Sequence, residues 1–217
     1  MRLSPSEPSL PPCRRAWTMT ATLILHLTCY FSVNRINALV PPSMLRDLSL
    51  PADAWIPYVG WTAAFYYFGV PFMSIWAFFV VWRLPAEAFR PAIRAYVGMI
   101  LIGAATQLVF PARSPWPSIP VPFQHFMHMR VSYDPFVCFP SMHVALSVLP
   151  ACLTSRSFHS RAVQAAVLLA ALMISLSTLT LKEHYLVDTV SGAVLALAAY
   201  ASVLRQLRSA PRRSKSL

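Results

Sequence analysis

The chain has 217 residues, of which 57% are hydrophobic and only 12% are charged, and its mean hydropathy is +0.54. Soluble domains usually carry about 25% charged residues. This composition excludes an ordinary soluble domain and predicts an all-α integral membrane protein. The net charge of +11 does not indicate a nucleic-acid partner, because the basic residues stand at the ends of apolar runs rather than along one polar face.

The first apolar run extends from about residue 17 to residue 33 and follows Arg14 and Arg15. Its layout resembles a signal peptide, but no small-residue cleavage site follows and more apolar runs come after it, so we expect an uncleaved span. The arginine pair is a weak match to a twin-arginine signal, and a positively charged flank explains it better. Residues 1–16 are expected to form a cytoplasmic tail.

Four further runs are long enough to cross about 30 Å of hydrocarbon, and they extend over about residues 56–82, 92–110, 162–181 and 184–204. A shorter run, 141–153, keeps its polar residues near its start, and Pro150 is expected only to kink it. We count this run as a span, which gives a bundle of six transmembrane helices over residues 17–205, with five spans as the alternative. Residues 206–217 are expected to form a basic cytoplasmic tail.

Two connectors are rich in proline. The segment 41–57 contains a possible short surface helix at 44–50. The segment 111–140 has prolines throughout and cannot be a regular helix. It could be an interfacial lid beside a site or a plain amphipathic connector. We read His125 and His128 as surface residues of that segment.

The basic residues also predict the topology. With six spans, most of the 18 lysines and arginines fall on one side, so both termini are expected to be cytoplasmic. His143 and His184 then face the periplasm or exterior. We expect a multi-pass protein of the bacterial inner (plasma) membrane with its active site on the non-cytoplasmic side.

No metal and no cofactor are expected. The four cysteines form no CxxC pair and no spacing typical of zinc ligands, which argues against structural disulfides and zinc; they are Cys13, Cys29, Cys138 and Cys152. His125 and His128 could share one helical face, but nearby prolines make a helix there doubtful. His26, inside the first run, is read as a neutral interhelical hydrogen-bonding residue.

His184 and Asp188 carry the strongest chemical signal. On a helix, residues four apart lie one turn apart on the same face, so the carboxylate could hold one imidazole nitrogen. A carboxylate inside an apolar helix costs about 2.5 to 3.5 kcal/mol at mid-membrane and therefore needs a partner. The alternative is a shallow aspartate that caps the helix or faces water. An oriented imidazole is a nucleophile or a base.

A second group of residues could bind and protonate a phosphate. Ser141 precedes an apolar run and is a plausible helix cap, and free N–H groups at a helix start favour anions. His143 at that position could donate a proton to a leaving oxygen. Arg113 and Lys182 lie on the predicted histidine side, and each could bind phosphate or be an interfacial cation.

Two stretches resemble elements of the type-2 phosphatidic acid phosphatase superfamily, which comprises integral membrane lipid-phosphate phosphatases and phosphotransferases. Residues 139–143, FPSMH, are similar to the family's P-S-G-H element, and residues 177–188, STLTLKEHYLVD, resemble its S-R-x5-H-x3-D element. The likeness covers roughly residues 100–205. The pattern looks closest to the branch related to inositol phosphorylceramide synthases.

The resemblance implies roles for these residues. His184 corresponds to the nucleophile that forms a phosphohistidine, Asp188 to its orienting carboxylate, and His143 to the acid that protonates the leaving alcohol. Ser141 and Arg113 would hold phosphate oxygens. No metal is implied.

Several positions depart from the family pattern. Thr106 and Ser114 replace the lysine and the proline of the first element, K-x6-R-P; Met142 replaces the glycine of the second, and Thr178 replaces the arginine of the third. Lys182 could replace the lost positive charge.

We therefore expect a membrane-embedded lipid-phosphate phosphatase that acts on a phosphorylated membrane lipid through a phosphohistidine, with water as the acceptor. A lipid phosphotransferase with an alcohol acceptor, similar to an inositolphosphotransferase or a phosphorylceramide synthase, is the first alternative, because acceptor choice depends on pocket shape. A non-enzymatic membrane carrier with a His/Asp proton relay is the second.

Overall fold

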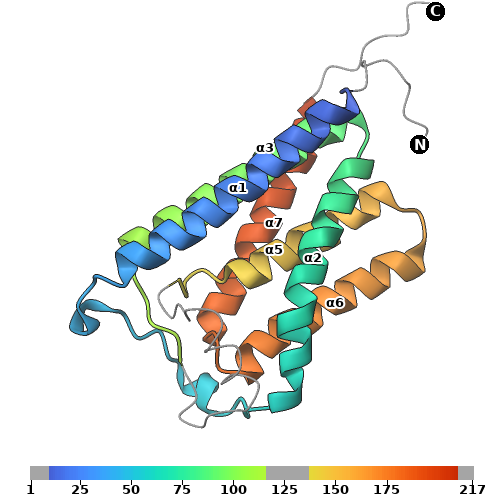
Figure 1. Cartoon of the computed structure of the whole chain (residues 1–217). Coiled ribbons are helices and arrows are strands. Elements are labelled where there is room, and N and C mark those ends of the chain that lie inside the picture. Colours follow the sequence, from blue (N-terminus) through green and yellow to red (C-terminus); the bar gives the residue numbers. More distant parts are fainter. Residues whose placement is uncertain (1–9, 116–136, 210–217) are drawn as a thin grey trace, which may run out of the picture.

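The computed structural model describes residues 10–115 and 137–209, and it is an α-helical bundle (Figure 1). Within these ranges there is no β-strand, and one isolated parallel bridge joins Arg46 to Ala112. The described helices are α1 (Pro12–Asn37), α2 (Ala63–Arg83), α3 (Ala86–Val109), α5 (Met142–Ser157), α6 (Arg161–Thr180) and α7 (Leu186–Ser209). The prediction of an all-α protein is confirmed.

Five of these helices are long and apolar enough to cross a membrane, namely α1, α2, α3, α6 and α7. The chain is therefore a multi-pass membrane protein. The sixth expected span, α5, is not confirmed, because its 16 residues extend over only about 24 Å at about 1.5 Å per residue. It packs against α2, α6 and α7, so much of its surface contacts protein.

Successive helices run in opposite directions (Figure 1). As a result, α1 begins and α7 ends at one end of the bundle, whereas α6 ends and α7 begins at the other. At the first end, Arg15 donates to the carbonyl oxygens of Trp82 and Leu84, both at 2.8 Å. We call this the basic end, and we call the opposite end, where His184 lies between α6 and α7, the histidine end.

The main core lies between α3, α5 and α7. Its fully buried side chains include Phe89, Met99, Leu149, Leu153 and Val203. The helix α1 packs against α3 on the outside of the bundle, and most of its large apolar side chains are exposed. That exposure is typical of a helix that faces lipid.

The connector between α1 and α2 differs from the prediction. The short surface helix expected at 44–50 does not form; 3-10 helices η1 (Pro42–Met44) and η2 (Pro51–Ala54) stand on either side instead. Between them Arg46 N–H donates to Pro111 O at 3.0 Å, and Arg46 O accepts from the N–H of Arg113 at 3.1 Å. These bonds to the chain after α3 hold the segment extended, so it cannot form helical hydrogen bonds.

The predicted lid or connector at 111–140 falls largely on residues 116–136, which lie outside the described residues, as do His125 and His128. The residues on either side of 116–136 are described. Ser114 Oγ donates to the carbonyl oxygen of Glu183, next to His184. The other end, 137–141, leads directly into α5.

Candidate active site

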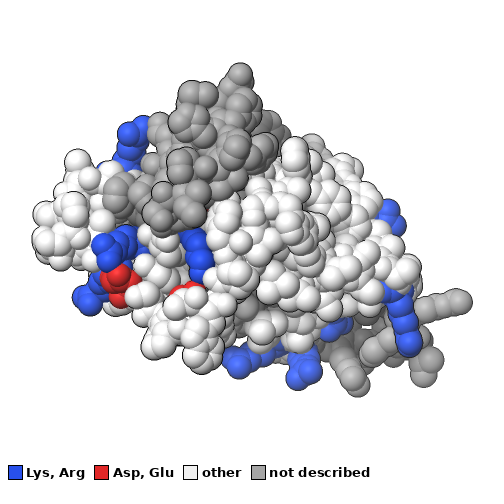
Figure 2. Space-filling model, turned by 90° about the horizontal axis from the view of Figure 1, so that it is seen from below, with Lys and Arg blue, Asp and Glu red and all other residues white. Residues whose placement is uncertain are grey.

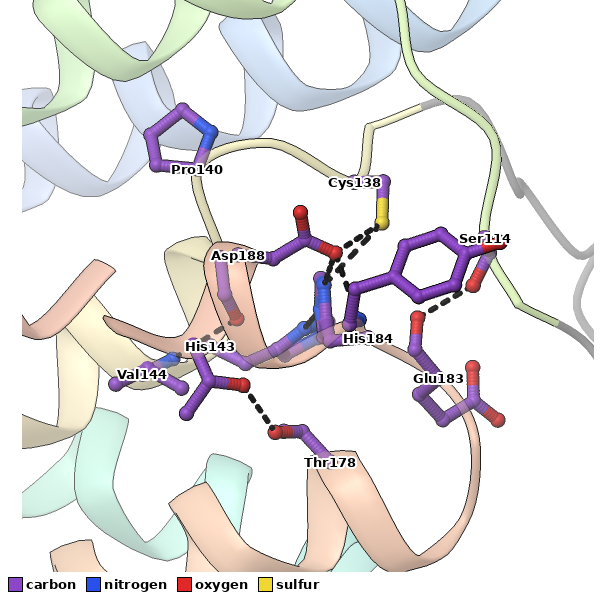
Figure 3. A network of polar contacts seen from close by, with 12 residues as sticks. Ser114, Cys138, Pro140, His143, Val144, Thr178, Glu183, His184 and Asp188 are labelled. Carbon is purple, nitrogen blue, oxygen red and sulfur yellow. Dashed lines mark hydrogen bonds and ion pairs between the residues drawn. The ribbon is translucent and has the colours of Figure 1, made fainter. Parts of the chain in front are cut away.

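Two histidines from distant parts of the chain meet at the histidine end (Figure 3). His143 Nδ1 lies 3.3 Å from His184 Nε2, and the ring centroids are 5.6 Å apart. His143 lies in the first turn of α5, and His184 lies in the turn between α6 and α7. The contact is a hydrogen bond if one of the two nitrogens carries a proton and the other does not.

Ser141 fixes the start of α5. It is the N-cap residue, and its Oγ accepts a hydrogen bond from Val144 N–H at 3.4 Å, so the predicted cap is confirmed. Its own N–H donates to the carbonyl oxygen of Asp188 at 3.1 Å. The start of α5, which carries His143, is therefore bonded directly to the first turn of α7.

Gln107 holds the chain that precedes α5. This buried residue of α3 donates from Nε2 to Val137 O at 3.2 Å and to Pro140 O at 3.3 Å. The backbone carbonyl oxygen of Gln107 accepts a hydrogen bond from Asn37 Nδ2 of α1 at 2.9 Å. Gln107 was not predicted as a site residue, although a lone amide inside an apolar span is a signal for such a role.

The turn that carries His184 is a Schellman motif at the end of α6. Glu183 N–H donates to Thr178 O at 3.0 Å, and Lys182 N–H donates to Leu179 O at 3.1 Å, with Lys182 in the left-handed region at φ 59°. His184 N–H also donates to Thr178 O, at 3.1 Å. Thr178, which replaces the motif arginine, thus holds the histidine turn through its carbonyl group.

The side chain of Lys182 attaches this turn to the η2 segment. Its Nζ donates to Asp53 O at 2.8 Å and to Ile56 O at 2.6 Å. In the same region Leu186 N–H donates to Asp53 Oδ1 at 2.8 Å. Lys182 was predicted as a phosphate ligand; in this structure its ammonium group bonds to two backbone carbonyls.

Asp188 both caps α7 and lies beside His184, which are the two alternatives that its position suggested. The residue is fully buried, and its Oδ2 accepts from Tyr185 N–H at 2.9 Å, which caps α7. The same oxygen lies 3.5 Å from His184 Nδ1. The run expected from about residue 184 becomes helical at Leu186, so His184 lies just outside α7. The histidine comes from the preceding turn and approaches the carboxylate from outside the helix.

Cys138 is a further member of the cluster that the sequence did not reveal. Its buried Sγ lies 2.7 Å from Asp188 Oδ2 and 3.5 Å from His184 Nδ1 (Figure 3). Burial and the neighbouring Asp188 carboxylate raise the pKa of the thiol well above its usual range, so the thiol stays protonated and donates to the carboxylate. These three side chains have the donor atoms and proximity to hold a metal ion.

Tyr66 of α2 lies against His143. Its hydroxyl oxygen is 3.4 Å from both ring nitrogens, and the two ring centroids are 4.9 Å apart. One turn further along α5, Ser147 Oγ donates to the backbone carbonyl oxygen of His143 at 2.8 Å. The contact with Tyr66 places the His143 ring between α2 and His184.

Arg113 lies near this group without joining the histidine pair. Its guanidinium forms an ion pair with Asp47, and the two side chains are 55% and 41% exposed. The guanidinium holds the pKa of the Asp47 carboxyl well below its usual range. Burial and Asp47 raise the pKa of Tyr185, the residue after His184, to about 12. Viewed from the histidine end, most of the described surface is uncharged (Figure 2). Lys and Arg stand next to acidic groups on one part of it, and further Lys and Arg stand at its edges without acidic neighbours.

Comparison with known proteins supports the resemblance found in the sequence. The profile of the PAP2 superfamily matches residues 47–202, a range that contains both histidine segments and all the side chains of the cluster. No curated protein and no solved structure matches the chain. Because the profile covers more than half of the chain, the protein belongs to the PAP2 superfamily, whose members are in general phosphatases or phosphotransferases.

Proposed function

We propose that this protein is a membrane-embedded lipid-phosphate phosphatase that works through a phosphohistidine on His184. The observation that carries the proposal is the placement of one imidazole between two partners. His143 Nδ1 lies 3.3 Å from its Nε2, and Asp188 Oδ2 lies 3.5 Å from its Nδ1. A nucleophile that has an acid–base group on one side and an orienting carboxylate on the other is typical of covalent catalysis.

In the first step, Asp188 accepts a hydrogen bond from His184 Nδ1–H, which keeps the proton on Nδ1 and leaves the lone pair on Nε2. This nitrogen attacks phosphorus, a P–N bond forms, and the bond from phosphorus to the lipid oxygen breaks. His143 takes up a proton when the negatively charged phosphate binds beside it, and it then gives this proton to that oxygen. The two imidazoles are in direct contact in this structure, so a phosphoryl group bound between them replaces that contact.

In the second step, the neutral His143 takes a proton from water, and the resulting hydroxide attacks phosphorus. The P–N bond breaks, inorganic phosphate leaves, and both histidines return to their initial protonation states. The same residue therefore acts as acid and then as base. Groups that stabilise the equatorial oxygens should supply much of the rate enhancement.

Three groups are proposed to bind those oxygens. Ser141 brings the N-terminus of α5, where backbone dipoles favour an anion. Arg113 offers a fork that matches phosphate geometry once it leaves Asp47. Lys182 is bound to carbonyls and would act through its charge beside His184, and also by holding the turn.

The proposed substrate is a phosphorylated lipid of the outer leaflet of a bacterial inner membrane. The histidines lie at the end of the bundle opposite the basic end, and basic ends of membrane proteins favour the cytoplasm. We therefore propose cytoplasmic termini, a non-cytoplasmic site and a catalytic membrane domain over residues 17–205. The first apolar helix would be retained as part of that domain.

The test uses purified full-length protein in detergent with a panel of labelled lipid phosphates. We expect release of inorganic phosphate and an acid-labile phosphoprotein that is absent from His184→Ala. His159→Ala, which changes a histidine in the α5–α6 connector, is the matched control. Retained turnover in His184→Ala would contradict the residue assignment.

Adding alcohol acceptors to the same assay separates phosphatase from phosphotransferase. Transfer of the phosphoryl or phosphodiester group to inositol or to a lipid hydroxyl, in place of phosphate release, would favour the transferase and the inositol phosphorylceramide synthase-like branch. If no lipid is turned over and no phosphoprotein is trapped, the carrier with a His/Asp relay becomes the better explanation.

A further inference from the structure

Cys138, His184 and Asp188 form a compact group of three different metal-ligating side chains. Their ligand atoms lie within 4.8 Å of one another. The distances from Sγ to Nδ1 and from Nδ1 to Oδ2 are both 3.5 Å, and the distance from Sγ to Oδ2 is 2.7 Å. All three residues are buried, with exposed fractions of 3%, 5% and 0%.

These distances suit a small tetrahedral ion. With ligand bonds of about 2.0 to 2.3 Å, ligand atoms around zinc lie about 3.3 to 3.7 Å apart. Two of the three separations already match. The third separation, from Sγ to Oδ2, is the S–H···O hydrogen bond. It needs to lengthen by about 0.8 Å when an ion takes the place of the thiol proton.

The carboxylate also has coordination capacity to spare. Asp188 Oδ2 is occupied by the thiol and by Tyr185 N–H, but Oδ1 is buried and has no hydrogen-bond partner among residues 10–115 and 137–209. An unsatisfied buried carboxylate oxygen is costly. A cation bound at Oδ2 would neutralise the carboxylate and so reduce that cost.

We propose that Cys138, His184 and Asp188 form a binding site for Zn²⁺ that switches the enzyme off. A thiolate, an imidazole and a carboxylate together favour zinc over magnesium or calcium, which prefer oxygen ligands. Three protein ligands leave the fourth position to water or to a phosphate oxygen. This role is separate from catalysis, because the proposed reaction needs no metal.

Inhibition follows from the nitrogen that the ion would occupy. A neutral imidazole with Zn²⁺ on Nδ1 carries its proton on Nε2, so Nε2 has no lone pair for attack on phosphorus. The ion also takes Asp188 away from its role as acceptor of Nδ1–H. When the ion binds, the thiol proton leaves to solvent, as it does for any cysteine ligand. This inhibition rests on the proposed function of His184, whereas metal binding itself does not.

The binding test uses Cd²⁺ as a spectroscopic probe of full-length protein in detergent. We expect a thiolate-to-metal charge-transfer band that saturates at one ion per chain. Cys152→Ser, which changes a cysteine on α5 outside the cluster, should keep the band, and Cys138→Ser should lose it. Loss of a single outer-shell partner already weakens metal sites about 10–100-fold, so we expect Cys138→Ser to bind at least tenfold more weakly. An unchanged band in Cys138→Ser would overturn the site.

The activity test adds Zn²⁺ to the lipid-phosphate assay and compares each variant with its own zinc-free rate. Wild type and Cys152→Ser should be inhibited, and Cys138→Ser should need at least tenfold more Zn²⁺. Equal inhibition of Cys138→Ser would show that zinc acts elsewhere, for example on the lipid phosphate, and would overturn the switch. If wild type turns over no lipid at all, the Cd²⁺ band still decides whether the site exists, so failure of the function and failure of the site remain distinguishable.

Discussion

Gly192 of α7 lies against the carbonyl group of Ser141 at the start of α5. A Cβ atom placed on Gly192 would be 2.3 Å from Ser141 O and 3.2 Å from Val144 Cβ. A side chain of any size is therefore excluded here unless the two helices separate. The close approach lets Ser141 N–H reach the carbonyl oxygen of Asp188 at 3.1 Å, so this glycine permits the contact between the start of α5, which carries His143, and the first turn of α7, which follows His184.

Gly192→Ala is expected to damage both stability and activity. The new methyl group meets a backbone carbonyl, which cannot rotate away, and overpacking of this kind costs about 1 to 3 kcal/mol. It would also push α5 away from α7 and lengthen the contact between His143 and His184, so we expect the turnover rate to fall at least about tenfold, since a misplacement of about 1 Å can cost about 100-fold. Thermal unfolding in detergent and phosphate release measure the two effects.

Gly98→Ala is the matched control, because a Cβ at Gly98 of α3 meets nothing within 4 Å. Alanine is favoured over glycine inside a helix by about 1 kcal/mol, so this variant should be at least as stable as wild type and fully active. Wild-type stability and activity in Gly192→Ala would show that the α5–α7 contact adjusts freely.

Lys182 should stabilise the histidine turn through its ammonium group. Lys182→Met and Lys182→Gly both lose the bonds to Asp53 O and Ile56 O. Only glycine relieves the left-handed backbone at φ 59°, which costs other residues about 1 to 2 kcal/mol. We therefore expect Lys182→Met to unfold at a lower temperature than wild type and Lys182→Gly to be more stable than Lys182→Met by about 1 kcal/mol. If Lys182→Met unfolds like wild type, the carbonyl contacts do not stabilise the turn.

Much of the site could be predicted because its motifs are local. Ser141 as a cap and Asp188 near His184 follow from short spacings, and the likeness to a family joined the two stretches. Cys138 and Gln107 could not be found in this way, because Cys138 lies 50 residues from Asp188 and Gln107 lies 30 and 33 residues from Val137 and Pro140. Only packing of α3, α5 and α7 brings them to the site.

Two details of the fold differ from the sequence pattern. The apolar pattern from residue 184 continues without a break into α7, but a Schellman turn after α6 delays the helix to Leu186. The pattern at 44–50 permits a helix, but bonds between Arg46 and the chain after α3 hold it extended. The first difference is a local turn that an apolar pattern does not show, and the second depends on hydrogen bonds to a segment more than 60 residues away.

The ion pair of Arg113 with Asp47 should compete with phosphate binding. We expect Arg113→Gln to raise KM for the lipid phosphate and Asp47→Asn, which frees the guanidinium, to leave KM unchanged or lower it. Both residues are largely exposed, so the competition should weaken at high salt. Steady-state kinetics at two ionic strengths measure these effects, and an increase of KM in Asp47→Asn would contradict them.

The charge state of this pair determines the pH range over which its effect on KM is constant. Arg113 holds the pKa of Asp47 below its usual range, so the carboxylate is charged at any assay pH above about 4. The stabilising effect of the pair is present above that pH and is lost as the pH falls through the lower pKa of the folded state. The ratio of KM between Asp47→Asn and wild type should therefore be constant from about pH 5 upward. A ratio that changes near neutral pH would indicate a different group.

Asp188 should show two separable roles, because one oxygen caps α7 and faces His184. Asn at this position can still accept Tyr185 N–H, but it carries no charge to hold the imidazole proton. We expect Asp188→Asn to fold with near-wild-type stability while kcat falls by a factor on the order of 10⁴, as for the orienting aspartate of serine proteases. Asp188→Ala should also lose the cap, at about 1 kcal/mol. Thermal unfolding and kcat of both variants test this, because a single role as a cap predicts that Asp188→Asn stays active, whereas a single role in catalysis predicts equal stability for the two variants.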